Sequence, residues 1–151
     1  LLAILASKSR DNSRTPMQWD ASQHAGFTEG EPWINLCDNA AEINVAAALS
    51  DADSVFYAYQ RLIALRKREP VITWGDYQDL LPDSPHLWCY QREWQGQRLL
   101  VIANLSDTFQ SWQPHHTGGN WQVLMHNYAE VASQPADMTL RPFEAVWWVQ
   151  K

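Results

Sequence analysis

The residues best suited to chemistry lie in one short run near the start of the chain, SRDNSRTPMQWD, from Ser9 to Asp20. Its arginine, aspartate and asparagine side chains could bind the hydroxyl groups of a polar ligand, or bind one another. The run shows neither the apolar spacing of a helix nor the alternation of a half-buried strand, so we expect a structured loop. Two interpretations stay open at this point, a binding loop and a hydrogen-bonded cluster that only holds the loop in shape.

Carboxylates in and after this loop are the first candidates for acid–base catalysis. Hydrolysis of a glycoside, for example, needs two carboxyl groups about 5 to 9.5 Å apart on either side of the bond. The available side chains are Asp11, Asp20, Glu29 and Glu31. No motif marks any of them as a catalyst, so we predict no catalytic residue in this chain.

Histidine and cysteine spacing gives no metal site. His115 and His116 would point to opposite faces of a strand, and the other three histidines, His24, His86 and His126, are isolated in the sequence. The chain has no paired Cys/His spacing for zinc, no Gly-rich phosphate loop and no Gly-x-Ser-x-Gly elbow. We therefore predict neither a metal nor a cofactor.

Charge and hydropathy exclude two classes of partner. The formal net charge is -6 and the pI about 5.2, whereas a protein that binds nucleic acid needs a basic face. The one basic run, residues 66–68, precedes Pro70, where it would complement the negative end of a helix dipole. No stretch approaches the roughly 20 apolar residues that span a membrane. We predict no nucleic acid and no membrane partner.

The beginning of the chain and its cysteines suggest a location. LLAILASKSR places its positive charges after a six-residue apolar run, which is the reverse of a secretory signal, and we interpret it as a helix cut in the middle. Cys37 and Cys89 are 52 residues apart and fit no redox or metal pair. Two unpaired thiols are typical of a reducing compartment, so we expect a cytoplasmic protein.

The chain changes character twice along its length. Residues 21–50 are rich in turn formers and are expected to be irregular. From Ser54 to Lys67 the apolar residues recur at helical spacing, with Ser50-x-x-Asp53 as a candidate capping box and Pro70 as a stop. Phe56, Tyr59 and Ile63 are among these apolar residues.

Beyond Trp74 short β-rich runs alternate with turn signals, which is typical of an antiparallel sandwich or barrel. A hairpin is predicted around Gln95-Gly96, which is flanked by HLWCYQRE and RLLVIANLS. Two further strands are expected: WQVLMHNY after a Gly118-Gly119-Asn120 turn, and FEAVWWVQ at the end of the chain. The nine tryptophans are more than a small core usually needs, and indole rings stack on sugars. A non-catalytic sugar-binding module and a purely structural β-domain therefore stay open.

RDNSRTPMQW closely resembles the loop after the eighth barrel strand in the α-glucosidase branch of the α-amylase family, glycoside hydrolase family 13. Three later segments resemble the same branch in the same order, namely AGFTEGEPWINL, SVFYAYQRLIALRK and LRPFEAVWW. The resemblance therefore covers essentially the whole chain. It implies an α/β part followed by an all-β part. Residues 1–72 would be the C-terminal end of a (β/α)₈ TIM barrel, and residues 73–151 a small antiparallel β-sandwich domain.

The resemblance also implies a function and one site residue. Arg14 is similar to the arginine that hydrogen-bonds the glucose at the non-reducing end in the innermost subsite, whereas Arg10, Asp11 and Asn12 would shape the loop and Trp19 would pack. The family's catalytic Asp, Glu and second Asp lie in earlier motifs that are absent here. This chain would therefore be an inactive C-terminal fragment of a retaining, exo-acting α-glucosidase, whose partner is the missing N-terminal barrel of the same polypeptide.

The substrate implied is a small sugar, either trehalose 6-phosphate or a short α-glucoside. Family members that act on trehalose 6-phosphate are the most similar to two segments of the β part, GDYQDLLPDSPHLWCYQREWQGQRLLVIANLS and NWQVLMHNYAE. Members that act on α-1,6-linked glucosides or dextran are the alternative.

Overall fold

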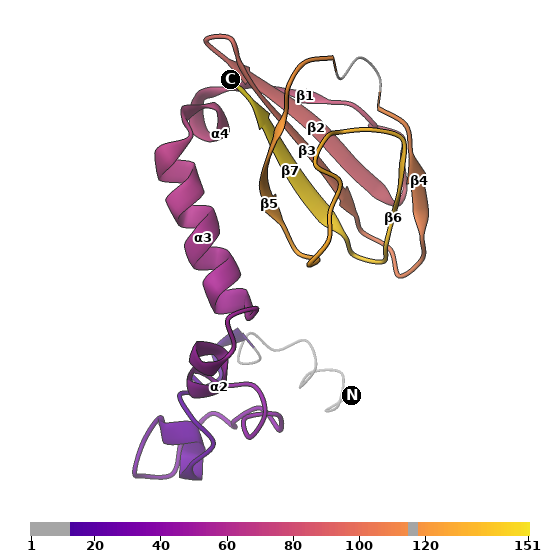
Figure 1. Ribbon diagram of the computed structural model, residues 1–151. Helices are drawn as coiled ribbons and strands as arrows, with labels where there is room; N and C mark the ends of the chain where they lie inside the picture. The colour runs from indigo at the N-terminus through magenta and orange to yellow at the C-terminus, as the bar shows by residue number, and fades with distance from the viewer. Residues whose placement is uncertain (1–12, 115–117) are drawn as a thin grey trace. The chain divides into compact units, whose positions relative to one another are not determined.

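A computed structural model describes residues 13–114 and 118–151. Its elements are η2 (Gln23–Gly26), α2 (Val45–Ser50), α3 (Val55–Arg68), α4 (Pro70–Trp74), β1 (Asp76–Asp79), β2 (Leu87–Trp94), β3 (Gln97–Asn104), β4 (Gln110–Trp112), β5 (Gln122–His126), β6 (Met138–Leu140) and β7 (Ala145–Gln150), which Figure 1 shows. The chain forms two compact units, the first ending at Ala64 and the second comprising Leu65–Lys151. The proposed domain boundary near residue 72 stays a prediction.

The predicted helix is confirmed as α3, which runs from Val55 to Arg68 and carries the basic run of residues 66–68 in its last turn. The exposed fractions of Phe56, Tyr59 and Ile63 are 43%, 65% and 47%. Pro70 ends one helix and begins another, because it occupies the first turn of α4, where its missing N–H costs nothing.

Two predictions for the segment before α3 were wrong. Residues 21–50 are not wholly irregular, because the Ala-rich sequence from Val45 to Ser50 forms α2. Ser50 does not form a capping box with Asp53, because it closes α2 and its hydroxyl donates to the carbonyl of Ala47 at 2.8 Å. Asp53 instead donates its N–H to the carboxylate of Asp51 at 2.9 Å.

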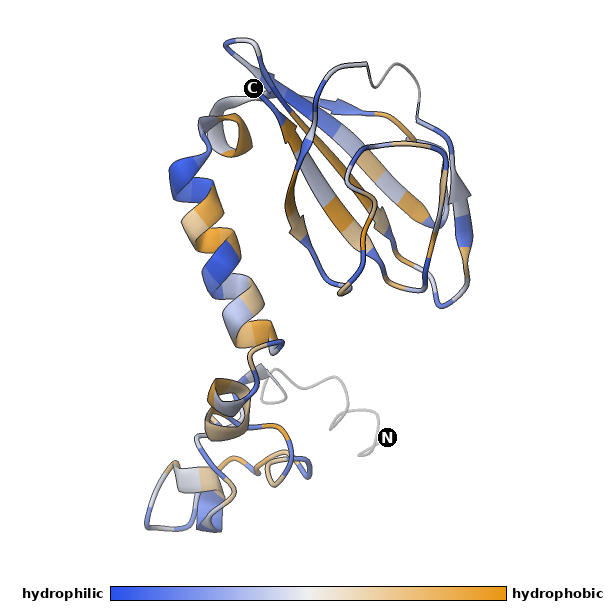
Figure 2. Cartoon of the chain, viewed as in Figure 1, coloured by the Kyte–Doolittle hydropathy of each residue, from blue (hydrophilic) through white to orange (hydrophobic). Residues whose placement is uncertain are grey.

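The second unit contains two antiparallel sheets, one of five strands in the order β1-β2-β3-β7-β5 and one formed by β4 and β6. The predicted hairpin is confirmed, with Trp94 opposite Gln97 in the β2–β3 pair. The two residues between them, Gln95 and Gly96, have φ values of 49° and 82°, which a tight hairpin turn requires. Figure 2 shows the alternation of apolar and polar residues along the strands.

Three tryptophans account for part of the unusual Trp content, because they form the core between the two sheets. Trp112 of β4 stacks on Trp148 of β7 with ring centroids 6.0 Å apart, and Trp121 is buried in the same cluster. The indole N–H of Trp148 donates to the carbonyl of Ala132 at 3.0 Å, so burial leaves no polar group unsatisfied there. Within residues 13–114 and 118–151, no helix combines the length and apolar character that crossing a membrane requires.

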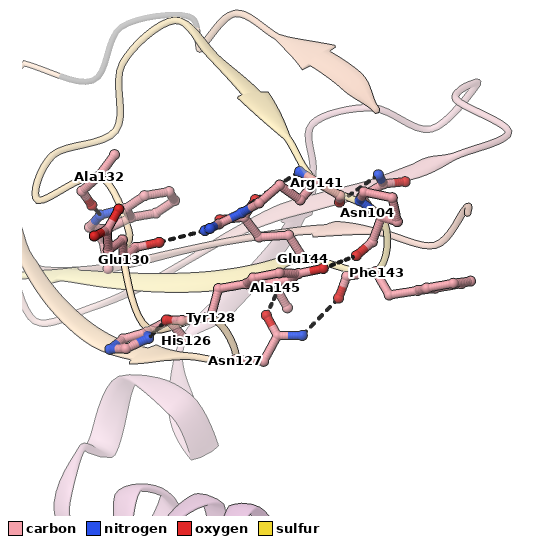
Figure 3. A network of polar contacts seen from close by, with 12 residues as sticks. Asn104, His126, Asn127, Tyr128, Glu130, Ala132, Arg141, Phe143, Glu144 and Ala145 are labelled. Atoms are coloured by element: carbon pink, nitrogen blue, oxygen red, sulfur yellow. Dashed lines mark hydrogen bonds and ion pairs between the residues drawn. The ribbon is translucent and has the colours of Figure 1, made fainter. Parts of the chain in front are cut away.

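The turn between β6 and β7 holds a buried ion pair (Figure 3). Glu144 is 2% exposed, and its carboxylate accepts from the Arg141 guanidinium at 2.7 Å and 3.0 Å and from the Arg141 backbone N–H at 2.8 Å. The guanidinium also lies 4.0 Å from the centre of the Tyr128 ring. Hydrogen bonds from Arg141 hold the pKa of the Glu144 carboxyl below its ordinary value, against the opposing effect of burial.

Two further polar side chains attach α4 to the large sheet. The Arg92 guanidinium donates to the carbonyls of Gly75, at 2.9 Å and 2.6 Å, and of Ile72, at 2.5 Å, which satisfies the free end of α4. Glu69 is 3% exposed and forms ion pairs with Arg68 at 3.0 Å and Lys151 at 3.2 Å. Burial raises the pKa of the Glu69 carboxyl, but the hydrogen bonds from these two cations outweigh it, so the net shift is downward.

We predict that Glu144→Gln destabilises the chain by about 2 kcal/mol at pH 7, since it removes the charge from a set of hydrogen bonds to a carboxylate. Because the pKa of Glu144 is lowered by folding, its stabilisation is complete above the unfolded value of about 4.3 and is lost as the pH falls through the folded value. Urea unfolding of both proteins between pH 7 and pH 3 measures this, and the difference should shrink with acidification. If the difference in unfolding free energy stays constant over this range, the charge of Glu144 does not contribute to stability.

Candidate functional site

The candidate site is the loop that contains Arg14. Arg14 is exposed and Pro16, two residues later, is buried. Arg10, Asp11 and Asn12, which were predicted to shape the loop, lie outside the described residues. The candidate therefore consists of Arg14 and the segment that follows it up to Phe27.

Backbone hydrogen bonds attach this loop to the start of α2. The N–H groups of Val45 and Ala46 donate to the carbonyls of Gln18 and Trp19, both at 2.9 Å. These N–H groups belong to the first turn of the helix and would otherwise lack an intrahelical partner. Asn44 caps the same helix, because its side-chain oxygen accepts from the N–H of Ala47 at 2.8 Å. The loop and the helix therefore position one another.

The Asp20 carboxylate is part of a turn. Its oxygen accepts from the backbone N–H of Ser22 at 2.8 Å and from the Ser22 hydroxyl. The hydroxyl contact, followed by the backbone contact, lowers the pKa of Asp20 below its ordinary value. These contacts favour a structural role for Asp20 in shaping the turn.

Three consecutive residues after this turn adopt left-handed backbone conformations. The φ values of His24, Ala25 and Gly26 are 52°, 55° and 65°. Only glycine adopts this region without cost, so the two preceding residues are strained. Ala25 is 2% exposed, and its carbonyl accepts from the N–H groups of Trp19 at 2.8 Å and Asp20 at 3.3 Å. These bonds and the burial offset the strain. Sequence reasoning missed this feature, because only Gly26 signals it.

A surface hollow of about 450 Å³ lies beside the left-handed residues, and it is lined by Ser22, Gln23, His24, Gly26, Phe27, Thr28 and Glu29. Arg14 does not line it, so the structure does not combine the predicted binding residue with this hollow. The nitrogen Nε2 of His24 lies 3.1 Å from the amide nitrogen of Gln23, which gives that histidine a local partner.

The remaining candidates are dispersed. Glu29 and Glu31 are exposed. Among the described residues, no group of three or more His, Cys, Asp or Glu side chains is arranged to hold a metal ion. Asp11, His115 and His116 lie outside the described residues, and His126 contacts the carbonyl of Tyr128.

The cysteines form no disulfide, and Cys37 is exposed while Cys89 is buried. Burial, and then the charge of Asp79, raises the pKa of the Cys89 thiol to about 12. Cys89 is therefore a neutral core residue near pH 7 rather than a nucleophile.

Comparison with known proteins points to one family. Residues 1–75 match the family described as "Alpha amylase, catalytic domain". The whole chain is 70% identical to the trehalose-6-phosphate hydrolase of Escherichia coli (strain K12) and covers 27% of that protein. It is 46% identical to the oligo-1,6-glucosidase of Heyndrickxia coagulans, with 99% of the chain and 26% of that protein aligned.

A solved structure agrees with these relatives. The trehalose-6-phosphate hydrolase TreA of Bacillus licheniformis is similar to this structure with a TM-score of 0.90 and 40% identity, over 97% of this chain and 27% of that one. The antiparallel, sheet-rich part of the predicted fold is thereby supported. The chain spans about a quarter of the length of the relatives that it matches.

We predict that Gly26→Ala destabilises the loop by at least about 1 kcal/mol, because an added Cβ would lie 2.7 Å from an Asp20 carboxylate oxygen and the residue would keep a positive φ. Gly30→Ala is the matched control, since its added Cβ would meet only the Thr28 hydroxyl, at 3.9 Å. Hydrogen exchange of the backbone amides of Trp19, Asp20 and Ala25 measures the effect. Equal exchange in the two variants would contradict the strained turn.

Proposed function

We propose that this chain, which belongs to the α-glucosidase branch of the alpha-amylase family, is the C-terminal part of a retaining, exo-acting α-glucosidase that splits trehalose 6-phosphate into glucose and glucose 6-phosphate. The observation that supports this substrate best is the 70% identity over the whole chain to the hydrolase of E. coli, against 46% to an oligo-1,6-glucosidase. The activity belongs to the full-length protein and its cytoplasmic location is part of the proposal.

In the proposed organisation, residues 1–72 end a (β/α)₈ barrel and residues 73–151 form the β-domain. The family match up to residue 75 and the end of α3 at Arg68 support a boundary in this region. Loops that follow barrel strands form the active-site face of this fold, which would place the loop of Arg14 at the sugar pocket.

The proposed division of chemistry follows from the residues present. The two carboxyl groups that form and hydrolyse a covalent glucosyl-enzyme come from the preceding part of the polypeptide. Arg14 contributes a guanidinium that is always charged and whose planar set of donors can hold a hydroxyl of the innermost glucose. Expressed alone, the chain would release no glucose from trehalose 6-phosphate, because it lacks both carboxyl groups.

Oligo-1,6-glucosidase activity is the second candidate, favoured by the 46% identity over nearly the whole chain. The two functions are separated by measuring kcat/KM of the full-length protein with trehalose 6-phosphate and with isomaltose, an α-1,6-linked glucose disaccharide. We expect trehalose 6-phosphate to be the better substrate by at least about 100-fold, because a site that pairs with a phosphate leaves buried polar groups unpaired without it. Equal or better hydrolysis of isomaltose would overturn the proposed substrate.

We predict that Arg14→Ala in the full-length protein lowers kcat/KM by roughly 10 to 150-fold, which corresponds to a charged hydrogen bond of about 1.5 to 3 kcal/mol. Arg14→Lys should restore little, because an ammonium group is a point charge without the planar fork.

The matched control is Arg66→Ala, which removes another exposed arginine, from the last turn of α3. Thermal midpoints are measured beside the kinetics, since a purely structural Arg14 would lower the midpoint and leave kcat/KM of the folded enzyme nearly intact. If Arg14→Ala keeps kcat/KM within about threefold, less than one good hydrogen bond, the substrate role is wrong.

A further inference from the structure

A compact segment leads into α2, and we call it the bracing segment, residues 39–46. The N–H group of Ile43 donates to the carbonyl of Asn39 at 2.8 Å. Asn44 is buried, and its side-chain amide donates to the carbonyl of Ala40 at 3.0 Å. These bonds lie within the segment, so they define its shape without help from the candidate loop.

Gln18 joins the loop of Arg14 to the bracing segment through both its backbone and its side chain. Its carbonyl accepts from the N–H of Val45 at 2.9 Å. Its side-chain amide donates to the carbonyl of Ile43 and, at 3.4 Å, to the side-chain oxygen of Asn39. The two kinds of contact fix both the position and the direction of the loop at this residue.

The backbone between Gln18 and Arg14 is short and stiff. Pro16 has a fixed φ and is buried, and Thr15 is confined to extended conformations because it precedes a proline. The hydroxyl of Thr15 also accepts from the thiol of Cys37 at 3.7 Å. Few dihedral angles between the two residues remain free to absorb a displacement, so a shift of Gln18 would also move Arg14.

We propose that Gln18 is a positioning residue for Arg14, which it holds in place by binding the bracing segment. The inference rests on the proposed function, in which Arg14 holds a hydroxyl of the innermost glucose. Gln18 is half-buried and, in this role, acts through Arg14 and not by touching the sugar. Small displacements matter here, because a hydrogen bond to a reacting sugar depends steeply on distance and direction.

A purely structural role is the competing explanation for these contacts. Helix α2 already has its cap, because the side-chain oxygen of Asn44 accepts from the N–H of Ala47 at 2.8 Å. The carbonyl of Ile43 belongs to a residue that is 63% exposed, so water can replace the Gln18 amide there. The helix and the bracing segment therefore keep their shape without this amide, and its removal should move the loop more than it lowers stability.

A double-mutant cycle in the full-length protein tests the proposal. Gln18→Met keeps the length of the side chain and removes its amide. We expect kcat/KM with trehalose 6-phosphate to fall about 5 to 20-fold, since a misplacement of about 1 Å can cost roughly 100-fold. In an Arg14→Ala background the same substitution should change kcat/KM by less than about twofold, because the contact that it positions is already absent. A fall by the same factor in both backgrounds would overturn the proposal.

A second substitution and a control separate the amide from the volume of the side chain. Gln18→Glu keeps the shape, but its ionised carboxylate only accepts hydrogen bonds and would face two acceptors, so we expect a loss at least as large as for Gln18→Met. Gln110→Met is the matched control, since that amide also donates two hydrogen bonds, to the hydroxyls of Ser106 at 3.3 Å and Thr108 at 3.0 Å, within the second unit. A loss for Gln18→Glu no larger than for this control contradicts the proposal.

The division of the loss between kcat and KM distinguishes positioning from stability. Gln18→Met should change kcat and KM in the same proportion as Arg14→Ala, because both remove the same contact with the sugar. Its thermal midpoint should stay within about 2 °C of the unmutated protein. A lower midpoint with unchanged kcat/KM would assign Gln18 a structural role and overturn the inference.

The outcomes also separate this inference from the proposed function. If the full-length protein cleaves isomaltose instead of trehalose 6-phosphate, the cycle is measured with isomaltose, and coupling there supports the inference while it removes the proposed substrate. If trehalose 6-phosphate is cleaved and the two substitutions act independently, this inference alone is wrong. An effect of Arg14→Ala below about threefold would remove both the substrate role of Arg14 and its positioning by Gln18.

Discussion

The buried carboxylate of Glu144 is the interaction on which the β part of this protein depends most. Its hydrogen bonds with Arg141 close the turn between β6 and β7. The backbone carbonyl of Glu144 also accepts from the N–H of Asn104 at 2.8 Å, where β3 ends. The Asn104 amide in turn donates to the carbonyls of Thr108 and Arg141 at 2.7 Å and 2.9 Å. One small region therefore fixes the ends of β3 and β7, which form the centre of the large sheet, and so fixes their register.

Register has a consequence for every other surface of the sheet, because a shift by one residue would exchange its two faces. With the observed pairing, Ile102 and Trp148 enter the core, and Leu99 and Val101 face the side that α4 covers. Two polar interactions then hold α4 at that side. Lys151 neutralises the buried carboxylate of Glu69 at the start of α4, and the guanidinium of Arg92 donates to the carbonyl of Gly75 at its end, so neither group is left buried and unpaired.

Local interactions are what the sequence made predictable. Helix α3 and the β2–β3 hairpin depend on neighbours within a few residues, namely the apolar period from Val55 to Arg68 and the Gln95-Gly96 turn. Non-local partners were not predictable. Glu69 also pairs with Lys151, 82 residues away, a cation that cannot be assigned before the strands are formed. The left-handed conformation of His24 has no residue signal of its own. The short helix α2 was missed because its start is satisfied by carbonyls of Gln18 and Trp19, a distant loop.

The candidate site was also only partly predictable from the sequence. The sequence predicts that the loop of Arg14 carries the chemistry. The structure shows how Asp20 and the strained Ala25 can hold part of that loop in one conformation through bonds to Ser22 and Trp19. Such rigidity would suit the proposed binding role of the loop, because a segment that is ordered before binding loses less entropy when the complex forms. In the proposed enzyme a contact with the glucose would contribute to catalysis only so far as it is stronger in the transition state than in the ground state. In the proposed role, the Arg14 guanidinium would have to meet a hydroxyl of the distorted sugar ring rather than of the relaxed one, because only a contact that strengthens in the transition state accelerates the reaction.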